Sequence, residues 1–219
     1  LSGIESADLT GGASSNVLDA GAFSGTVTID GGAGADTLTG GAGSDTLSGG
    51  AGDDVLTGGA GTNSLDGGAD SDEVHHSEDT DLTLTDTSLG SDTLANIENA
   101  VLTGGVGDNV IDASAFSGSV TISGGAGADD IKGGAAAASL DGGAGNDTIL
   151  GGAGNDLISG GAGDDVLSGA EGSDSIDGGT DSDKIVQSVD ADQTLTDSGL
   201  SGQGSDTLAS IESADLTGG

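Results

Sequence analysis

The chain of 219 residues holds 47 glycines, 38 acidic residues and only two basic ones, which gives a formal charge of −36. Pro, Cys, Met, Trp and Tyr are absent and Phe occurs twice, so Val, Leu, Ile and Ala must build any core. The absence of Cys excludes disulfides, thiolate zinc sites and cysteine nucleophiles. So negative a charge repels nucleic acid and anionic lipid, and no apolar run reaches the roughly 18 residues of a membrane span. We therefore expect cations as small partners, no nucleic acid and no direct membrane insertion.

Residues 1–30 are predicted to be a connector with degenerate coils. The string IESADLTGG at 4–12 opens it, and Gly11–Asp19 reads as a degenerate repeat with Asn16 at an acidic position. The chain starts at Leu1, without an initiating Met or a signal-peptide pattern, which favours a piece of a longer protein or a processed product.

Two blocks of nonapeptides follow, five units at 31–75 and seven at 124–186. Each unit begins with Gly and has an aliphatic residue at its eighth position, and its sixth position is Asp in ten of the twelve units. In the last unit of each block, Asp70 and Asp181 replace the fourth-position Gly and are expected to end the block. A disordered acidic tail has no reason to keep an aliphatic residue in register, so the repeats indicate an ordered array.

Residues 76–123 are predicted to be a second connector, and 187–219 a connector with the start of a third module. The opening string returns as IENAVLTGG at 97–105 and as IESADLTGG at 211–219. A window cut from a longer tandem array would have this pattern. Neighbouring copies of the same module, covalently joined or head to tail, are therefore expected partners.

Each nonapeptide divides into a turn and a strand. The GGxGx half supplies residues that reach positive φ, and the x-U-x half (U, aliphatic) is a short strand with one inward side chain. Two units would form a coil of about 18 residues, and stacked coils would form two facing parallel sheets. One aliphatic side chain per nine residues makes a thin core, so another stabiliser is required. Calcium suits the turns, because it takes six to eight carboxylate and carbonyl oxygens, whereas Mg²⁺ demands a tighter octahedron.

The nonapeptide GGxGxDxUx resembles that of RTX, or haemolysin-type calcium-binding, proteins. The resemblance is specific for residues 31–75 and 124–186. It implies an all-β fold, a right-handed parallel β-roll or β-solenoid with several calcium ions in the turns, and secretion from the cell. The connectors are similar to linker-repeat modules of very large secreted bacterial surface proteins, which implies an extracellular or cell-surface location.

The resemblance also implies that sixth-position side chains two units apart share a calcium ion with turn carbonyls. Asp45 with Asn63 is expected to be a weak pair, and the place of Ala138 opposite Asp156 is expected to be empty or weak. The implied metal ligands are Asp36, Asp45, Asp54, Asn63, Asp72, Asp129, Asp147, Asp156, Asp165, Asp174 and Asp183.

Two further expectations concern the second block. GGAAAASL at 133–140 also lacks its fourth-position Gly, which adds to the expected weakness of that site. The interior residues Asp147 and Asp165 are expected to face two sites each, and Asp183, as the end of its row, only one.

The function that these features favour is a calcium-binding structural module of an extracellular fibre, adhesin stalk or surface layer, which folds on calcium after secretion. Two alternatives stay open: a C-terminal secretion and folding appendage of a secreted enzyme, and a calcium-dependent solenoid that binds ice or glycan. An ice-binding face needs a ladder of Thr, whereas the third position is Ala in ten of twelve units. No enzyme activity is expected of the chain itself, because repetition gives the carboxylates alike environments and catalysis needs unlike ones.

Overall fold

The computed structural model describes residues 3–189 and 191–218, and within these ranges the chain forms 25 strands and no helix. The all-β prediction is confirmed. Over the same ranges, no helix is long and apolar enough to cross a membrane. The chain divides into two compact units, Leu1–His76 with Thr85–Val101 and Ser77–Leu84 with Leu102–Gly219. The connector at 76–123 is thus shared between both units.

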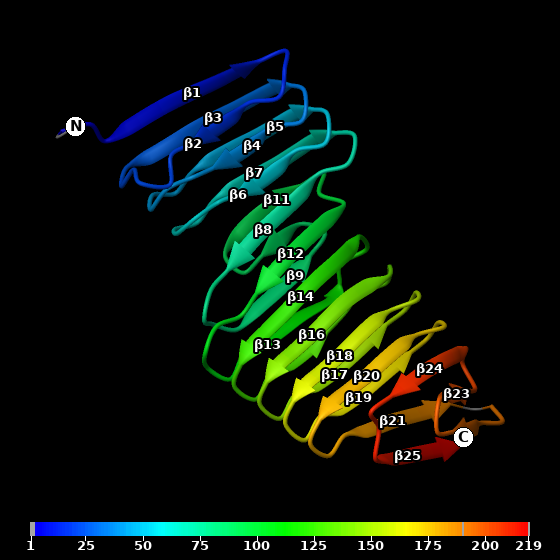
Figure 1. Cartoon of the computed structure of the whole chain (residues 1–219). Helices are drawn as coiled ribbons and strands as arrows, with labels where there is room; N and C mark the ends of the chain where they lie inside the picture. Colours follow the sequence, from blue (N-terminus) through cyan, green and yellow to red (C-terminus); the bar gives the residue numbers. More distant parts are fainter. Residues whose placement is uncertain (1–2, 190, 219) are drawn as a thin grey trace. The chain divides into compact units, whose positions relative to one another are not determined.

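In the first unit, the strands from β1 to β8 alternate between two sheets (Figure 1). One sheet has the order β1-β3-β5-β7-β11-β10 and the other the order β2-β4-β6-β8. The strands are β1 (Ser6–Gly12), β2 (Val17–Asp19), β3 (Thr26–Ala33), β4 (Thr37–Thr39), β5 (Thr46–Ala51), β6 (Val55–Thr57), β7 (Ser64–Ala69), β8 (Glu73–Ser77), β10 (Ser88–Leu89) and β11 (Asp92–Ala95).

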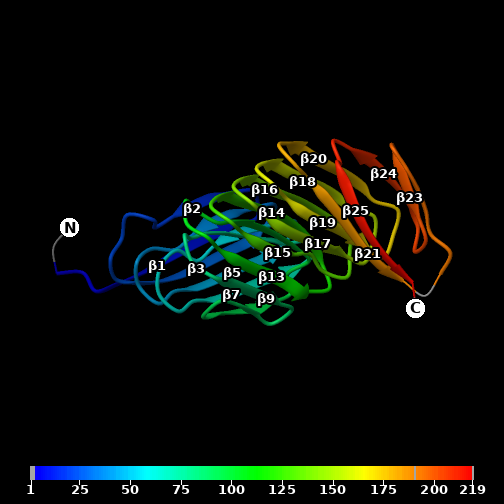
Figure 2. The same ribbon diagram turned by 90° about the horizontal axis from the view of Figure 1, so that it is seen from below.

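The second unit has the same design. One sheet has the order β9-β13-β15-β17-β19-β21-β25 and the other β14-β16-β18-β20-β24-β23-β22, and Figure 2 shows β14, β16, β18 and β20 in a layer separate from β13, β15, β17 and β19. The chain boundary between the units falls within β12 (Asn99–Thr103). The other strands are β9 (Leu82–Thr85), β13 (Val110–Ala115), β14 (Ser119–Ala126), β15 (Asp130–Lys132), β16 (Ala138–Ala144), β17 (Thr148–Gly152), β18 (Leu157–Ala162), β19 (Val166–Ala170), β20 (Ser175–Thr180), β21 (Lys184–Val189), β22 (Thr194–Thr196), β23 (Gly199–Ser201), β24 (Ser205–Ala209) and β25 (Ser213–Gly218).

The register of the parallel pairs shows one coil for every two nonapeptides. Leu38 pairs with Leu56 across β4 and β6, and Ile158 pairs with Ile176 across β18 and β20. Strands such as β5 include the following GGA as well as the predicted x-U-x, and there Gly50 pairs with Gly68 and Ala51 with Ala69 of the next coil. The fold is therefore a parallel β-solenoid, as predicted.

The eighth-position aliphatic side chains form the core of each unit. Because the pleat turns alternate side chains to opposite faces, each strand sends this side chain inward against the facing sheet. The twelve residues are 0–2% exposed: Leu38, Leu47, Leu56, Leu65, Val74, Ile131, Leu140, Ile149, Ile158, Leu167, Ile176 and Ile185.

In ten of the twelve nonapeptides, the turn has left-handed backbone at the second and fourth positions. Gly50 and Gly52 have φ of 112° and 115°, and a Cβ on Gly50 would collide with the carbonyl oxygen of Gly32 in the preceding coil. Asp70 and Asp181 hold the same conformation at the fourth position, with φ of 83° and 85°. The turn therefore keeps its form where each block ends.

Connector segments add strands to the blocks, which the sequence pattern did not predict. β10 and β11 form a short antiparallel hairpin, and β11 then pairs in parallel with β7, so that Leu94 continues the row of Leu65. In the second unit β23 and β24 are antiparallel, and Leu208 of β24 continues the row of Ile176. Each block is thus followed by one further coil of non-repeat sequence.

Candidate metal centres

Among the described residues, the sixth-position side chains stack in four columns, two in each unit. Within a column, the backbone N–H of one residue donates to Oδ1 of the sixth-position side chain two repeats later, as from Asp36 to Asp54 at 2.7 Å and from Asp54 to Asp72 at 2.8 Å. We call them the Asp36 column (Asp36, Asp54, Asp72), the Asp45 column (Asp45, Asn63), the Asp129 column (Asp129, Asp147, Asp165, Asp183) and the Asp156 column (Ala138, Asp156, Asp174).

The columns bring together the residue pairs that the sequence predicted. All their Asp and Asn side chains are between 0 and 3% exposed, although Asp and Asn are mostly surface residues. The 18-residue coil is the cause, because it places every second sixth position at the same edge of the stack. Ligation of a metal by these side chains stays a prediction.

One oxygen of most column carboxylates is buried without any partner. Oδ1 accepts the backbone N–H, but Oδ2 faces inward and has no hydrogen bond within the described residues. The atoms concerned are Oδ2 of Asp36, Asp54, Asp72, Asp129, Asp147, Asp156, Asp165, Asp174 and Asp183. A buried carboxylate oxygen without a partner is costly, so the columns fit a bound cation. Asp45 differs, because the N–H of Gly41 donates to its Oδ2 at 2.6 Å.

Backbone carbonyls lie beside these oxygens. A Cβ on Gly31, the first position of its repeat, would stand 2.5 Å from Asp36 Oδ2 and 2.5 Å from the carbonyl oxygen of Gly49. Only glycine leaves this space free. No group of three or more His, Cys, Asp or Glu side chains that could hold a metal occurs in the part of the chain that the structure describes. A cation here would therefore combine two carboxylates with several carbonyls, and such an oxygen-only set suits calcium.

Burial raises the pKa of eight of the column carboxyls. The pKa values of Asp72, Asp156 and Asp165 rise to about 6, chiefly because burial disfavours the charged form, and neighbouring carboxylates of the same column add to the rise. Backbone N–H donors act in the opposite direction without cancelling it. The pKa is also raised, with burial as the largest cause, in Asp54, Asp129, Asp147, Asp174 and Asp183.

The two expected weak places keep the backbone stack but lack one carboxylate. Ala138 donates its N–H to Asp156 Oδ1 at 2.8 Å, as an Asp would, and offers no side-chain oxygen. The fourth-position residue Ala136 is not at positive φ, and neither is Gly43 at the equivalent place of the first block. The missing glycine therefore does not alter this turn, and the lost carboxylate is the relevant change.

Four acidic residues outside the nonapeptides continue the columns, and the sequence analysis missed them. They lie in the repeated strings SDTLANIE at 91–98 and SDTLASIE at 205–212, which was the available signal. The donating N–H groups and accepting side chains are Asn63 to Asp92 (2.7 Å), Asp72 to Glu98 (3.0 Å), Asp174 to Asp206 (3.1 Å) and Asp183 to Glu212 (2.8 Å). The expectation that Asp183 ends its column is therefore wrong.

Comparison with known proteins identifies the repeats. The family described as RTX calcium-binding nonapeptide repeat (4 copies) matches residues 28–56, 39–74, 48–82, 117–137, 123–158, 136–167 and 150–185, together more than half of the chain. No curated protein matches. Among solved structures, the extracellular lipase LipA from Serratia marcescens is similar, with 22% identity, a TM-score of 0.31, and coverage of 86% of this chain but 38% of the lipase chain.

Restoring the missing carboxylate should create a site. We expect Ala138→Asp to bind one more calcium ion per chain than the wild type, because its carboxylate would stand opposite the unpartnered Oδ2 of Asp156. Isothermal titration calorimetry measures the stoichiometry. Ala137→Asp is the matched control, since it adds the same charge at an exposed neighbouring position. Equal stoichiometry in the wild type and Ala138→Asp would contradict the pairing.

Without calcium, acidification should favour folding. Carboxyls with native pKa values of about 6 bind more protons in the folded chain than in the unfolded one, where the value is near 3.9. The free energy of unfolding in a chelator should therefore increase as the pH falls from 7.5 to about 5. Thermal unfolding followed by circular dichroism measures this free energy. With calcium present the trend should reverse, since protons compete with the metal. A calcium-free chain that loses strand content on acidification would refute this assignment.

Proposed function

The chain belongs to the family of RTX calcium-binding nonapeptide repeat proteins, and we propose that it is a structural module which becomes ordered when calcium fills its carboxylate columns outside the cell. The observation that carries the proposal is the set of buried Oδ2 atoms without partners. The core holds only one aliphatic side chain per repeat. In the calcium-free chain, the desolvation and mutual repulsion of these carboxylates destabilise the fold further. Each bound calcium ion removes both costs.

Calcium concentration then decides where the chain folds. Calcium sites of extracellular modules typically have dissociation constants of about 10⁻⁴–10⁻³ M, far above cytosolic calcium levels. A chain of net charge −36 would stay open during export and fold on reaching millimolar calcium. This supports an extracellular location, in a fibre, an adhesin stalk or a surface layer.

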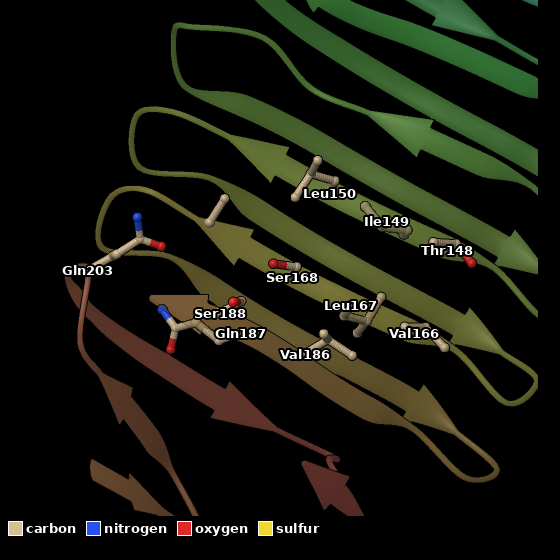
Figure 3. A pocket seen from close by; sticks show the side chains of 11 residues that line it. Thr148, Ile149, Leu150, Val166, Leu167, Ser168, Val186, Gln187, Ser188 and Gln203 are labelled. Carbon is tan, nitrogen blue, oxygen red and sulfur yellow. The ribbon is translucent and has the colours of Figure 1, made fainter. Parts of the chain in front are cut away.

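One surface groove fits a structural role better than catalysis. A groove of about 370 Å³ lies over β17, β19 and β21 of the second unit, where Figure 3 shows Leu150, Val166 and Val186 among its lining side chains. The remaining lining consists of aliphatic, Ser, Thr and Gln residues, so this described groove offers no acid or base. The column carboxylates are buried and share one kind of environment, which suits metal binding rather than proton transfer.

Calcium-dependent folding is directly testable. Far-UV circular dichroism should show a largely disordered chain in excess chelator and a β-rich chain at millimolar calcium, while the same concentration of magnesium should have little effect. Asp147→Asn and Asp165→Asn, which remove charge from the middle of the Asp129 column, should raise the calcium midpoint. A spectrum that the chelator leaves unchanged would refute the proposed function.

We further propose that modules join end to end. β1 and β25 carry the same sequence, SADLTG, and each pairs on one side with a strand of its own unit, β1 with β3 and β25 with β21. An edge strand with a free side is a template for another strand. The acidic sides of the solenoid would discourage lateral association.

End-to-end joining predicts assembly of separate chains at millimolar calcium. A head-to-tail contact does not close on itself, so particles should lengthen with protein concentration. Light scattering and electron microscopy would follow this growth. A Thr217→Lys variant, with a charge on β25, should shorten the particles. Folded monomers at every concentration would exclude assembly of separate chains.

A further inference from the structure

In each unit, a glutamate follows the last repeat Asp of the longer column. Asp72 donates its N–H to Glu98 Oε2 at 3.0 Å, and Asp183 donates to Glu212 Oε2 at 2.8 Å. The equivalent distance between two repeat residues, Asp54 N to Asp72 Oδ1, is 2.8 Å. Each glutamate therefore puts a carboxylate where the next sixth-position Asp of the column would stand.

The connector coils also reproduce the backbone carbonyl. A Cβ on a first-position glycine inside a block would meet the carbonyl oxygen of the first-position glycine in the next coil, as Gly31 meets Gly49. A Cβ on Gly67 would meet the carbonyl of Asn96 instead, and one on Gly178 would meet that of Ser210. Asn96 and Ser210 have φ of 51° and 52°, a left-handed conformation that is uncommon for residues other than glycine. Both coils thus share an unusual turn beside the column.

The repeat carboxylates next to these glutamates, those of Asp72 and Asp183, each have one oxygen without a hydrogen-bond partner in the described structure. Asp72 and Asp183 are 0% exposed, and Oδ2 of each is buried without a hydrogen bond in the described structure. Burial raises the pKa of both, and the charge of the neighbouring glutamate, Glu98 or Glu212, adds to the rise. Two carboxylates that repel each other around an unpartnered oxygen and a carbonyl are the same combination that occurs inside the columns.

We propose that Glu98 and Glu212 are calcium ligands, and that each completes one further site with Asp72 or Asp183 at the junction of block and connector. The inference rests on the proposed calcium binding of the columns and extends it beyond the nonapeptides. Its consequence is that calcium fastens the first connector coil to the end of each block. Asp183, like Asp147, then contributes to two sites.

The neighbouring Asp45 column provides a contrast. There the continuing residue is Asp92, and its partner is Asn63, whose Nδ2 donates to Asp92 Oδ2 at 3.2 Å. The amide supplies the donor that the Asp–Glu pairs lack, so this junction needs no cation. Asp92→Asn therefore serves as a control at the same end of the same block.

The test is the calcium stoichiometry of the 219-residue chain, measured by isothermal titration calorimetry and by native mass spectrometry. Glu98→Gln and Glu212→Gln keep an oxygen that can accept the N–H of Asp72 or Asp183 and remove only the charge. Each variant should bind one calcium ion fewer than the wild type, and the double variant two fewer. Asp92→Asn should bind as many as the wild type. Glu5→Gln, in the same IES sequence as Glu212 but with no column before it, should do the same.

The outcomes separate the two proposals. A wild-type chain that binds no calcium would overturn the proposed function itself. A wild-type chain that binds calcium, with unchanged stoichiometry in the double glutamine variant, would overturn the terminal sites alone. Should a glutamine variant fail to fold at saturating calcium, Glu98→Asp and Glu212→Asp replace it. These shorter carboxylates should weaken one calcium site per substitution at least tenfold, and an unchanged isotherm would overturn the inference.

Discussion

The structure depends on burying carboxylates against backbone groups at the edges of the solenoid. Apart from Asp45, each column Asp accepts the N–H of the preceding coil with one oxygen and keeps the other buried without a partner in the described structure. The hydrogen bond to the first oxygen links one coil to the next, and the buried second oxygen fits a bound cation. If calcium binds as proposed, the same side chain takes part in both, and coil stacking and metal binding are then energetically coupled.

Glycine makes the burial of these carboxylates in the turns possible. The first-position glycines leave room for the carboxylate, and positive φ at positions such as Gly50 and Gly52 lets the chain reverse within a few residues. The cost is a core with little apolar bulk, supplied mainly by rows of Leu and Ile. A solenoid of this composition is stable only when interactions in its turns add to the stability of the core. This explains why the turn geometry is the same in most units, while the residues at the outward positions vary.

The connectors belong to the same structural system as the blocks. Leu94 and Leu208 extend the aliphatic rows, and Glu98 and Glu212 extend the columns, although neither lies in a nonapeptide. Each of these segments follows its block and ends in a copy of the string that also forms β1. Each block, of five or seven repeats, is thus followed by a closing coil whose sequence is similar but not identical in the two cases. This organisation allows blocks of different length to share one kind of junction.

The sequence by itself determined the solenoid, the 18-residue coil and the column pairs, because a strict nine-residue period leaves one way to align Leu38 with Leu56 or Asp36 with Asp54. It also predicted weak calcium sites at Asn63 and Ala138, since these two residues interrupt the sixth-position Asp pattern, and this stays a prediction. Tertiary structure alone decided what lies beyond the period. Asp72 and Glu98 are 26 residues apart, and Asp183 and Glu212 are 29 apart, so no fixed spacing links them. Only the folding of the intervening hairpins brings these carboxylates onto the columns, because the segments that form the hairpins lack the nine-residue period.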